Sequence, residues 1–65
     1  MLTRYLIYTK ELSIQERESL RKAIAENSWT YGENYVENYF DVCLEPTTSL
    51  DSLGPVIKNC VVLKL

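Results

Sequence analysis

The chain has 65 residues, of which 46% are hydrophobic and 25% charged, and its net charge is −2. A chain this short makes one domain (residues 1–65) that buries about 60% of its unfolded surface, and its composition is that of a globular protein. It has no histidine, and its two cysteines, Cys43 and Cys60, lack CxxC spacing. This argues against a zinc site, a histidine-assisted nucleophile and a disulfide framework, and we expect both cysteines to be reduced and half-buried.

The first two elements expected along the chain are a strand and a helix. Residues Thr3–Thr9 are rich in β-branched and aromatic types and contain no Gly or Pro, which predicts a strand. Ser13 and Glu16 have the spacing of a capping box, so we expect a helix to begin there. Its apolar stripe is expected to consist of Ile14, Leu20, Ala23 and Ile24. Trp29 is expected to be a core anchor at the helix exit.

The next stretch repeats a tyrosine every fourth residue, with an acid two places after each. The tyrosines are Tyr31, Tyr35 and Tyr39, and the acids are Glu33, Glu37 and Asp41. Helical periodicity puts the apolar residues of 30–45 on one side and would make this segment a second helix over a two-stranded sheet. The residue types favour a strand instead, and a third strand would make the sheet less marginal. We therefore predict a strand over residues 33–45 and keep the helix as the alternative.

The C-terminal third predicts a short helix and a last strand. Thr48 suits its N-cap, Gly54 suits a left-handed residue at its end, and Pro55 prevents its continuation. Cys60–Leu65 then reads as a strand. The predicted fold is α+β in the order β-α-β-α-β, with a three-stranded sheet and one main helix.

Several functional classes are disfavoured by what the chain lacks. No stretch approaches the roughly 20 apolar residues of a membrane span, and the N-terminal apolar run is too short for a secretory signal, so we expect a cytoplasmic protein that does not bind membranes. Gly32 and Gly54 are isolated, and no phosphate-binding or calcium-binding loop is present. We expect no cofactor, no metal and no enzymatic activity. Acid–base work by Glu33 and Glu37 is a third, weaker reading.

The charges are unevenly distributed. The segment from Ala23 to Ile57 holds six acids and no base, a charge of −6, whereas the two ends hold seven bases and three acids, a charge of +4. We expect the three acids of the repeat to share one exposed face in either conformation. Such a row of like charges costs stability unless a base offsets it, which a partner or Arg17 and Arg21 of the first helix could supply.

The leading functional hypothesis is a small, non-enzymatic protein-binding module. Its partner-binding residues would be the six of the repeat, docked on a basic surface of a larger protein. The specific form is an inhibitor or regulator that presents carboxylates where nucleic-acid phosphates would sit, without binding nucleic acid itself. The alternative is a structural or self-assembling subunit that forms a homodimer through a sheet edge, with Cys60–Leu65 or Arg4–Thr9 as the pairing strand.

Overall fold

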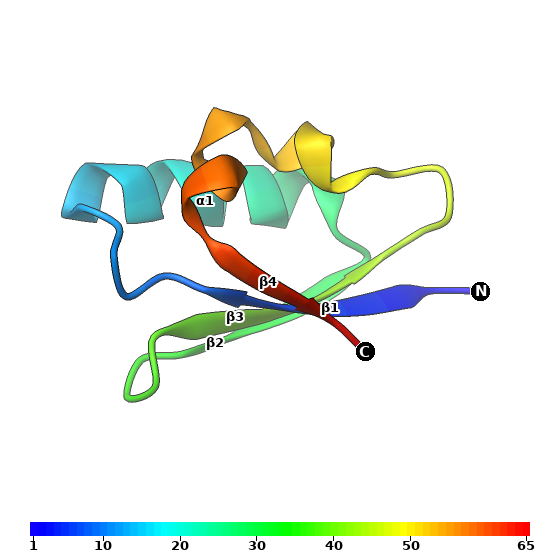
Figure 1. Cartoon of the computed structure of the whole chain (residues 1–65). Coiled ribbons are helices and arrows are strands. Elements are labelled where there is room, and N and C mark those ends of the chain that lie inside the picture. The colour runs from blue at the N-terminus through cyan, green and yellow to red at the C-terminus, as the bar shows by residue number, and fades with distance from the viewer.

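Four strands, one α-helix and two 3-10 helices account for most of the chain in the computed structural model, which describes residues 1–65 (Figure 1). In chain order they are β1 (Thr3–Tyr8), α1 (Ile14–Asn27), β2 (Thr30–Asn34), β3 (Tyr39–Leu44), η1 (Leu50–Leu53), η2 (Pro55–Asn59) and β4 (Val61–Lys64). The expected α+β domain with one main helix is confirmed. The sheet, however, has four strands and not three.

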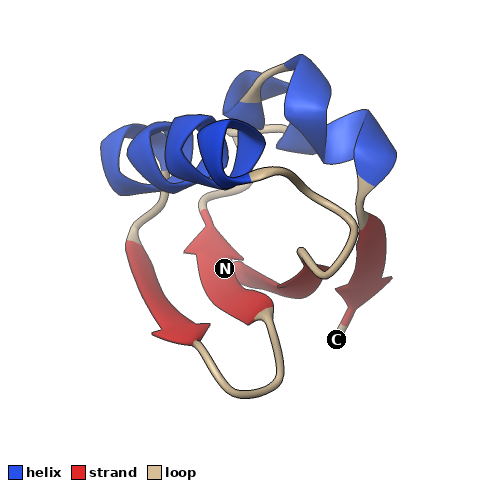
Figure 2. Cartoon of the chain, turned by 90° about the vertical axis from the view of Figure 1, so that its left-hand side faces the viewer, coloured by secondary structure: helices blue, strands red, loops and turns tan.

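The strands lie in the order β2-β3-β1-β4, and every neighbouring pair is antiparallel. This is a split β-α-β arrangement, because β3 lies between the two strands that α1 connects. The helices all lie on one side of the sheet, so the molecule has two layers and one sheet face stays uncovered (Figure 2). Since β1 is paired on both sides, the expectation that Arg4–Thr9 offers a free edge is wrong. Of the two expected pairing segments, only Cys60–Leu65 contains an outer strand, β4.

Helix α1 begins as predicted. The Ser13 hydroxyl accepts from the Glu16 N–H at 3.1 Å, and the Glu16 carboxylate accepts from the Ser13 N–H at 3.0 Å, which completes the capping box. Leu20 and Ile24 are fully buried, but Ile14 is exposed, which corrects the predicted stripe. Ile14 precedes Leu20 by six residues, about 120° around the helix, and so points away from the sheet.

The core lies between the helices and the covered face of the sheet. Strands β1 and β3 contribute Ile7, Phe40 and Val42 to it, and α1 contributes Leu20 and Ile24. The loop after β1 and the 3-10 helices close the cluster with Leu12, Leu53 and Ile57. Each residue of this kind that leaves water contributes about 1.5–3 kcal/mol. The core therefore fixes which sheet face is covered.

The segment 33–45 is neither the single strand we expected nor the alternative helix. It belongs to a hairpin, in which residues 35–38 turn the chain between β2 and β3. Asn38 has a positive φ of 58°, which Asn tolerates better than most residues, and the Asn34 side chain accepts from the Glu37 N–H at 2.8 Å. Both asparagines thus form the turn.

The chain after β3 contains 3-10 turns where one short helix was expected. Ser49 is the N-cap of η1 in place of Thr48. Gly54 has the expected positive φ, 90°, but its ψ of 175° is extended, so it does not adopt the left-handed helical conformation we expected. Trp29 is 64% exposed and is no core anchor, because it precedes the outer strand β2 and no layer lies beyond it. Cys43 and Cys60 are half-buried, as expected, and unpaired.

Candidate protein-docking surface

The three acids of the repeat do not share a face, contrary to the sequence-based expectation. Glu33 lies opposite Phe40 in the hairpin register and so points to the helix-covered side. Asp41 lies opposite Gly32 and points to the uncovered side, while Glu37 sits in the turn. Spacing along one helix or strand does not apply here, because the three residues come from two antiparallel strands and their turn. Their role in partner binding, like that of the three tyrosines, stays a prediction.

Glu33 is held by the protein's own helix. The Arg21 guanidinium donates to both of its carboxylate oxygens, each at 2.8 Å, and also pairs with Glu18. The Glu33 side chain is only 11% exposed, and the hydrogen bonds from Arg21 hold the pKa of this carboxyl below its usual range. Arg21 therefore offsets the acidic repeat as one reading of the sequence expected. Arg17 makes no ion pair with the repeat and donates to the Thr9 carbonyl at 3.2 Å, but its charge also contributes to lowering the pKa of Glu33.

Asp41 has a second internal partner on the uncovered side. Arg4 donates to its two carboxylate oxygens at 2.9 and 2.6 Å, and these hydrogen bonds lower the pKa of Asp41. This pair is more exposed than the Arg21–Glu33 pair, so solvent screens it more strongly. Glu37 is the one acid of the repeat that makes no ion pair. The repeat thus offers a partner much less free negative charge than its sequence indicates.

The three tyrosines of the repeat also separate. Tyr31 lies on the covered side of the outer strand β2, where half of it is exposed, and Tyr35 is exposed in the turn. Tyr39 is half-buried on the uncovered side, with its ring 5.6 Å from that of Tyr8 and tilted by 54°. The repeat is therefore neither one packing stripe nor one docking surface.

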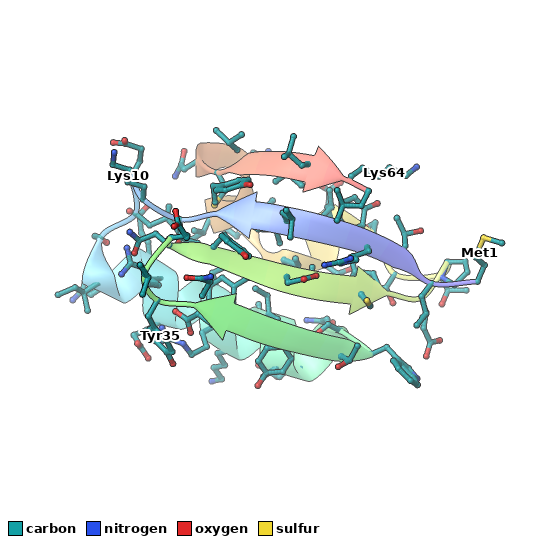
Figure 3. The ribbon with its side chains drawn as sticks, turned by 90° about the horizontal axis from the view of Figure 1, so that it is seen from below. Met1, Lys10, Tyr35 and Lys64 are labelled. Atoms are coloured by element: carbon teal, nitrogen blue, oxygen red, sulfur yellow. The ribbon has the colours of Figure 1, made fainter.

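The uncovered sheet face, which we call the open face, has an apolar and a polar half (Figure 3). The pairing registers place five apolar side chains of β1 and of the β4 segment together on it. This apolar half consists of Leu6, Tyr8, Val61, Leu63 and Leu65. The last three are 67%, 47% and 60% exposed, respectively. On β2 and β3 the same face carries mostly polar or small residues, namely Thr30, Gly32, Asn34 and Asp41, with Tyr39 and Cys43 beside them.

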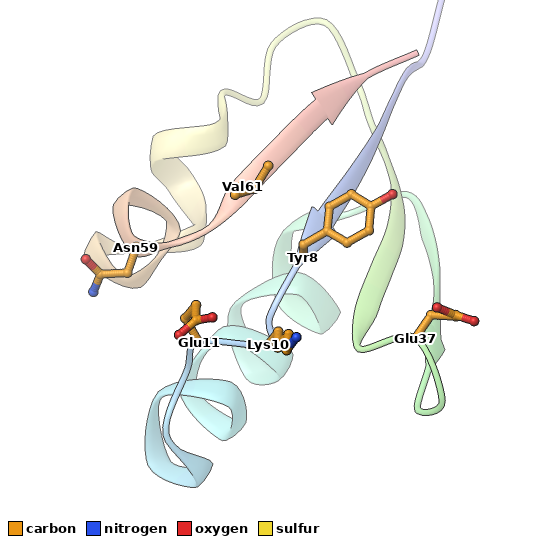
Figure 4. A pocket seen from close by; sticks show the side chains of 6 residues that line it. All are labelled: Tyr8, Lys10, Glu11, Glu37, Asn59 and Val61. Atoms are coloured by element: carbon orange, nitrogen blue, oxygen red, sulfur yellow. The ribbon is translucent and has the colours of Figure 1, made fainter.

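One end of the apolar half continues into a hollow of about 390 Å³ (Figure 4). Tyr8 and Val61 give it an apolar floor. Polar side chains from the loop after β1, the hairpin turn and η2 surround that floor, namely Lys10, Glu11, Glu37 and Asn59. An apolar centre inside a polar rim is the usual anatomy of a protein interface. The hollow also brings Glu37 to the border of the open face.

Sequence reasoning missed the open face because residues 4–9 have apolar side chains on both sides of the strand. Tyr5 and Ile7 pack on the core, while Leu6 and Tyr8 point the other way. The structure contains no group of three His, Cys, Asp or Glu side chains that would hold a metal, and none of its helices combines the length and the apolar content needed to cross a membrane. Comparisons with protein-family models, with curated protein sequences and with solved structures give no match for this chain.

Proposed function

We propose that this chain is a small, non-enzymatic protein-binding module whose contact surface is the apolar half of the open face. The observation that carries the proposal is the group of five apolar side chains on a sheet face that no helix covers. A sheet normally buries its apolar faces against another layer, and a contiguous exposed apolar patch is typical of an interaction site.

The partner is a protein that supplies the missing layer, with an apolar surface of its own. Tyrosine and arginine are enriched where proteins meet, and here Tyr8 belongs to the patch, Tyr39 borders it and Arg4 lies beside it. Single-stranded nucleic acid is a poorer match. Stacking of bases on aromatic rings normally comes with a cationic groove, and the Arg4 charge is already engaged by Asp41.

Docking on a basic surface, the form of this function expected from the sequence, receives less support from the geometry. Glu33 and Asp41 are engaged in internal ion pairs and would have to exchange them for external ones. Glu37 and Glu11 at the rim of the hollow are the carboxylates placed to steer a basic partner toward the open face. The role of an inhibitor or regulator of a larger protein is compatible with either surface.

The test compares two double variants with the wild type as baits in a pull-down. Leu6→Gln with Tyr8→Gln removes apolar groups from the open face. The matched control, Ile14→Gln with Val36→Gln, removes equally apolar groups that are exposed elsewhere. We expect one protein to be captured by the wild type and the control but not by the open-face variant, with all three baits folded by circular dichroism. Capture by all three baits alike would contradict the proposal.

The captured protein, once purified, allows a direct map of the contact. On titration into the isotope-labelled chain, amide signals of β1 and β4 should shift more than those of α1, and shifts confined to α1 would contradict the proposal. The Glu37→Gln variant tests docking on a basic surface. If the acids steer the partner, this variant should bind more weakly and with a smaller salt dependence. Tight, salt-sensitive binding of a mixed-sequence single-stranded oligonucleotide would overturn the choice of a protein partner.

A further inference from the structure

The hydrogen-bonding groups on the free edge of β4 follow from the pairing pattern. The Leu65 N–H donates to the Arg4 carbonyl at 2.9 Å, and these two residues lie opposite each other by extension of the β1–β4 register. Antiparallel strands alternate between hydrogen-bonded and non-hydrogen-bonded pairs. Leu63 and Val61 therefore also direct their backbone groups toward β1. Val62 and Lys64 direct theirs outward, which leaves two N–H and two carbonyl groups without a strand partner.

The edge at the other side of the sheet is less suited to strand pairing. The Thr9 N–H donates to the Asn38 carbonyl at 2.8 Å, so the even-numbered residues of β3 direct their backbone groups toward β1 and the odd-numbered ones toward β2. The even-numbered residues of β2 lie opposite these odd-numbered residues of β3. The outward residues of β2 are therefore Tyr31 and Glu33. Glu33 points its charge to the covered side and is clamped by Arg21. An inward-pointing charge on an outer strand is a known device against edge-to-edge association. β4 also carries a charge on the covered side, because Lys64 lies opposite Tyr5, but Lys64 is exposed and makes no ion pair, so nothing clamps it against the edge.

We propose that β4 pairs with β4 of a second copy, antiparallel about a two-fold axis through Leu63, to form a continuous eight-stranded sheet. In this register Val62 lies opposite Lys64 of the partner subunit, and Lys64 opposite the partner subunit's Val62. Each pair exchanges two hydrogen bonds, so all four outward groups of each chain are satisfied. Pairing of an edge with its own copy is closed by its symmetry and does not propagate into filaments.

Neighbouring registers fit less well. A two-fold axis through Val62 would place Lys64 opposite the partner's Cys60, and the Cys60 N–H already donates to the Ile57 carbonyl at 3.1 Å. An axis through Lys64 would place two ammonium groups directly opposite each other, which destabilises a strand pair. The axis through Leu63 avoids both costs.

The side chains favour the same register. At the axis, Leu63 meets its own copy in a non-hydrogen-bonded pair, where side chains approach most closely, and Val61 lies opposite Leu65 of the partner subunit. All of these side chains are on the open face. The apolar halves of the two copies therefore join into one strip at the centre of the sheet, and the polar halves lie outside. This inference does not depend on the proposed function, because the edge and the face are different surfaces.

The test uses two variants of one residue, measured by sedimentation equilibrium over a dilution series. Lys64→Pro removes an outward N–H that β4 does not use within the chain, whereas Lys64→Ala removes the side chain and keeps that N–H. We expect the wild type and Lys64→Ala to move from the 7.6 kDa mass of one chain toward twice that mass with rising concentration. Lys64→Pro removes two of the four hydrogen bonds and should weaken association by about tenfold or more.

Several results would overturn the proposal. One is a wild type that stays at the single-chain mass up to millimolar concentration. Another is a Lys64→Pro variant that associates as tightly as the wild type, or a Lys64→Ala variant that loses association to the same extent. If Lys64→Pro fails to fold by circular dichroism, its N–H is needed inside the chain and the assignment of outward groups is wrong. The Leu6→Gln, Tyr8→Gln variant should still dimerise, so failure of the proposed function would be visible separately.

Discussion

The outer strands β2 and β4 stand in similar positions in the sheet but expose different edges. β2 carries Glu33, which points inward and is clamped by Arg21 from α1. β4 has apolar side chains on the open face and two residues whose backbone groups point outward. One of these two, Lys64, also lies on the covered side, opposite Tyr5, but it is exposed and no ion pair holds it there. The difference shows how a small sheet can discourage pairing at one edge with a single ion pair and leave the other edge available.

The largest expected effect distinguishes the residues of β4 whose backbone groups face β1 from those whose backbone groups face outward. Leu63→Pro removes a hydrogen bond to β1 and a half-exposed apolar side chain, and should lower the free energy of unfolding by about 3 kcal/mol. Lys64→Pro should lower it by less than about 1 kcal/mol, because proline is tolerated where the N–H faces outward on an outer strand. Urea unfolding of dilute samples measures both values. Equal losses would contradict the assignment of inward and outward groups.

The next effect tests the ion pair at the β2 edge. Arg21→Met leaves the mostly buried Glu33 carboxylate without its donor and should lower the free energy of unfolding by about 2 kcal/mol. The matched control is Arg4→Met, which breaks the more exposed pair with Asp41 and should cost clearly less. Thermal unfolding by circular dichroism compares the two variants. If Arg21→Met lowered the free energy of unfolding less than Arg4→Met does, the Arg21–Glu33 pair would not be what protects the β2 edge.

The pH dependence of stability should report the same pair. Arg21 holds the pKa of Glu33 below its ordinary value of 4.5 in the folded protein. The stabilisation is therefore present above that value and is lost as the pH falls through the lower pKa of the folded state. We expect the wild type to exceed Glu33→Gln in unfolding free energy near neutral pH, and the difference to shrink in acid. Urea unfolding at a series of pH values checks this, and a difference independent of pH would contradict it.

The smallest effect concerns the turn that brings β2 alongside β3. Asn38 has a positive φ of 58°, so Asn38→Ala should cost about 1 kcal/mol, whereas Asn38→Gly should stay within a few tenths of the wild type. Chemical denaturation resolves the two. If alanine were tolerated as well as glycine, the left-handed turn would not be what fixes the register of the β2 edge.

The fold was predictable where its determinants are local. β1, β4 and the start of α1 follow from residue types and from the Ser13–Glu16 capping box. The hairpin was not predictable, because Asn34 and Asn38 lie inside a repeat with helical periodicity. Pairing of β3 with both β1 and β2 decides in favour of strands, and the pairing with β1 joins segments that are far apart in the sequence.

The candidate surface was less accessible to sequence reasoning than the fold. The Arg21–Glu33 pair was foreseen as one of two ways to offset the acids, whereas the Arg4–Asp41 pair joins residues 37 positions apart and depends on the strand register. The open face was hidden because Leu6 and Tyr8 alternate with equally apolar core residues. Only the topology shows which of the two sides the helices cover.

The most direct test of the difference between the two edges is a dilution series of amide proton–nitrogen NMR spectra of the wild type. We expect the amide signals of Val62 and Lys64 to shift with concentration, because these groups gain partners on association, while those of Tyr31 and Glu33 stay in place. Shifts at Tyr31 and Glu33 without shifts at Val62 and Lys64 would contradict this expectation, as would spectra that do not change with concentration.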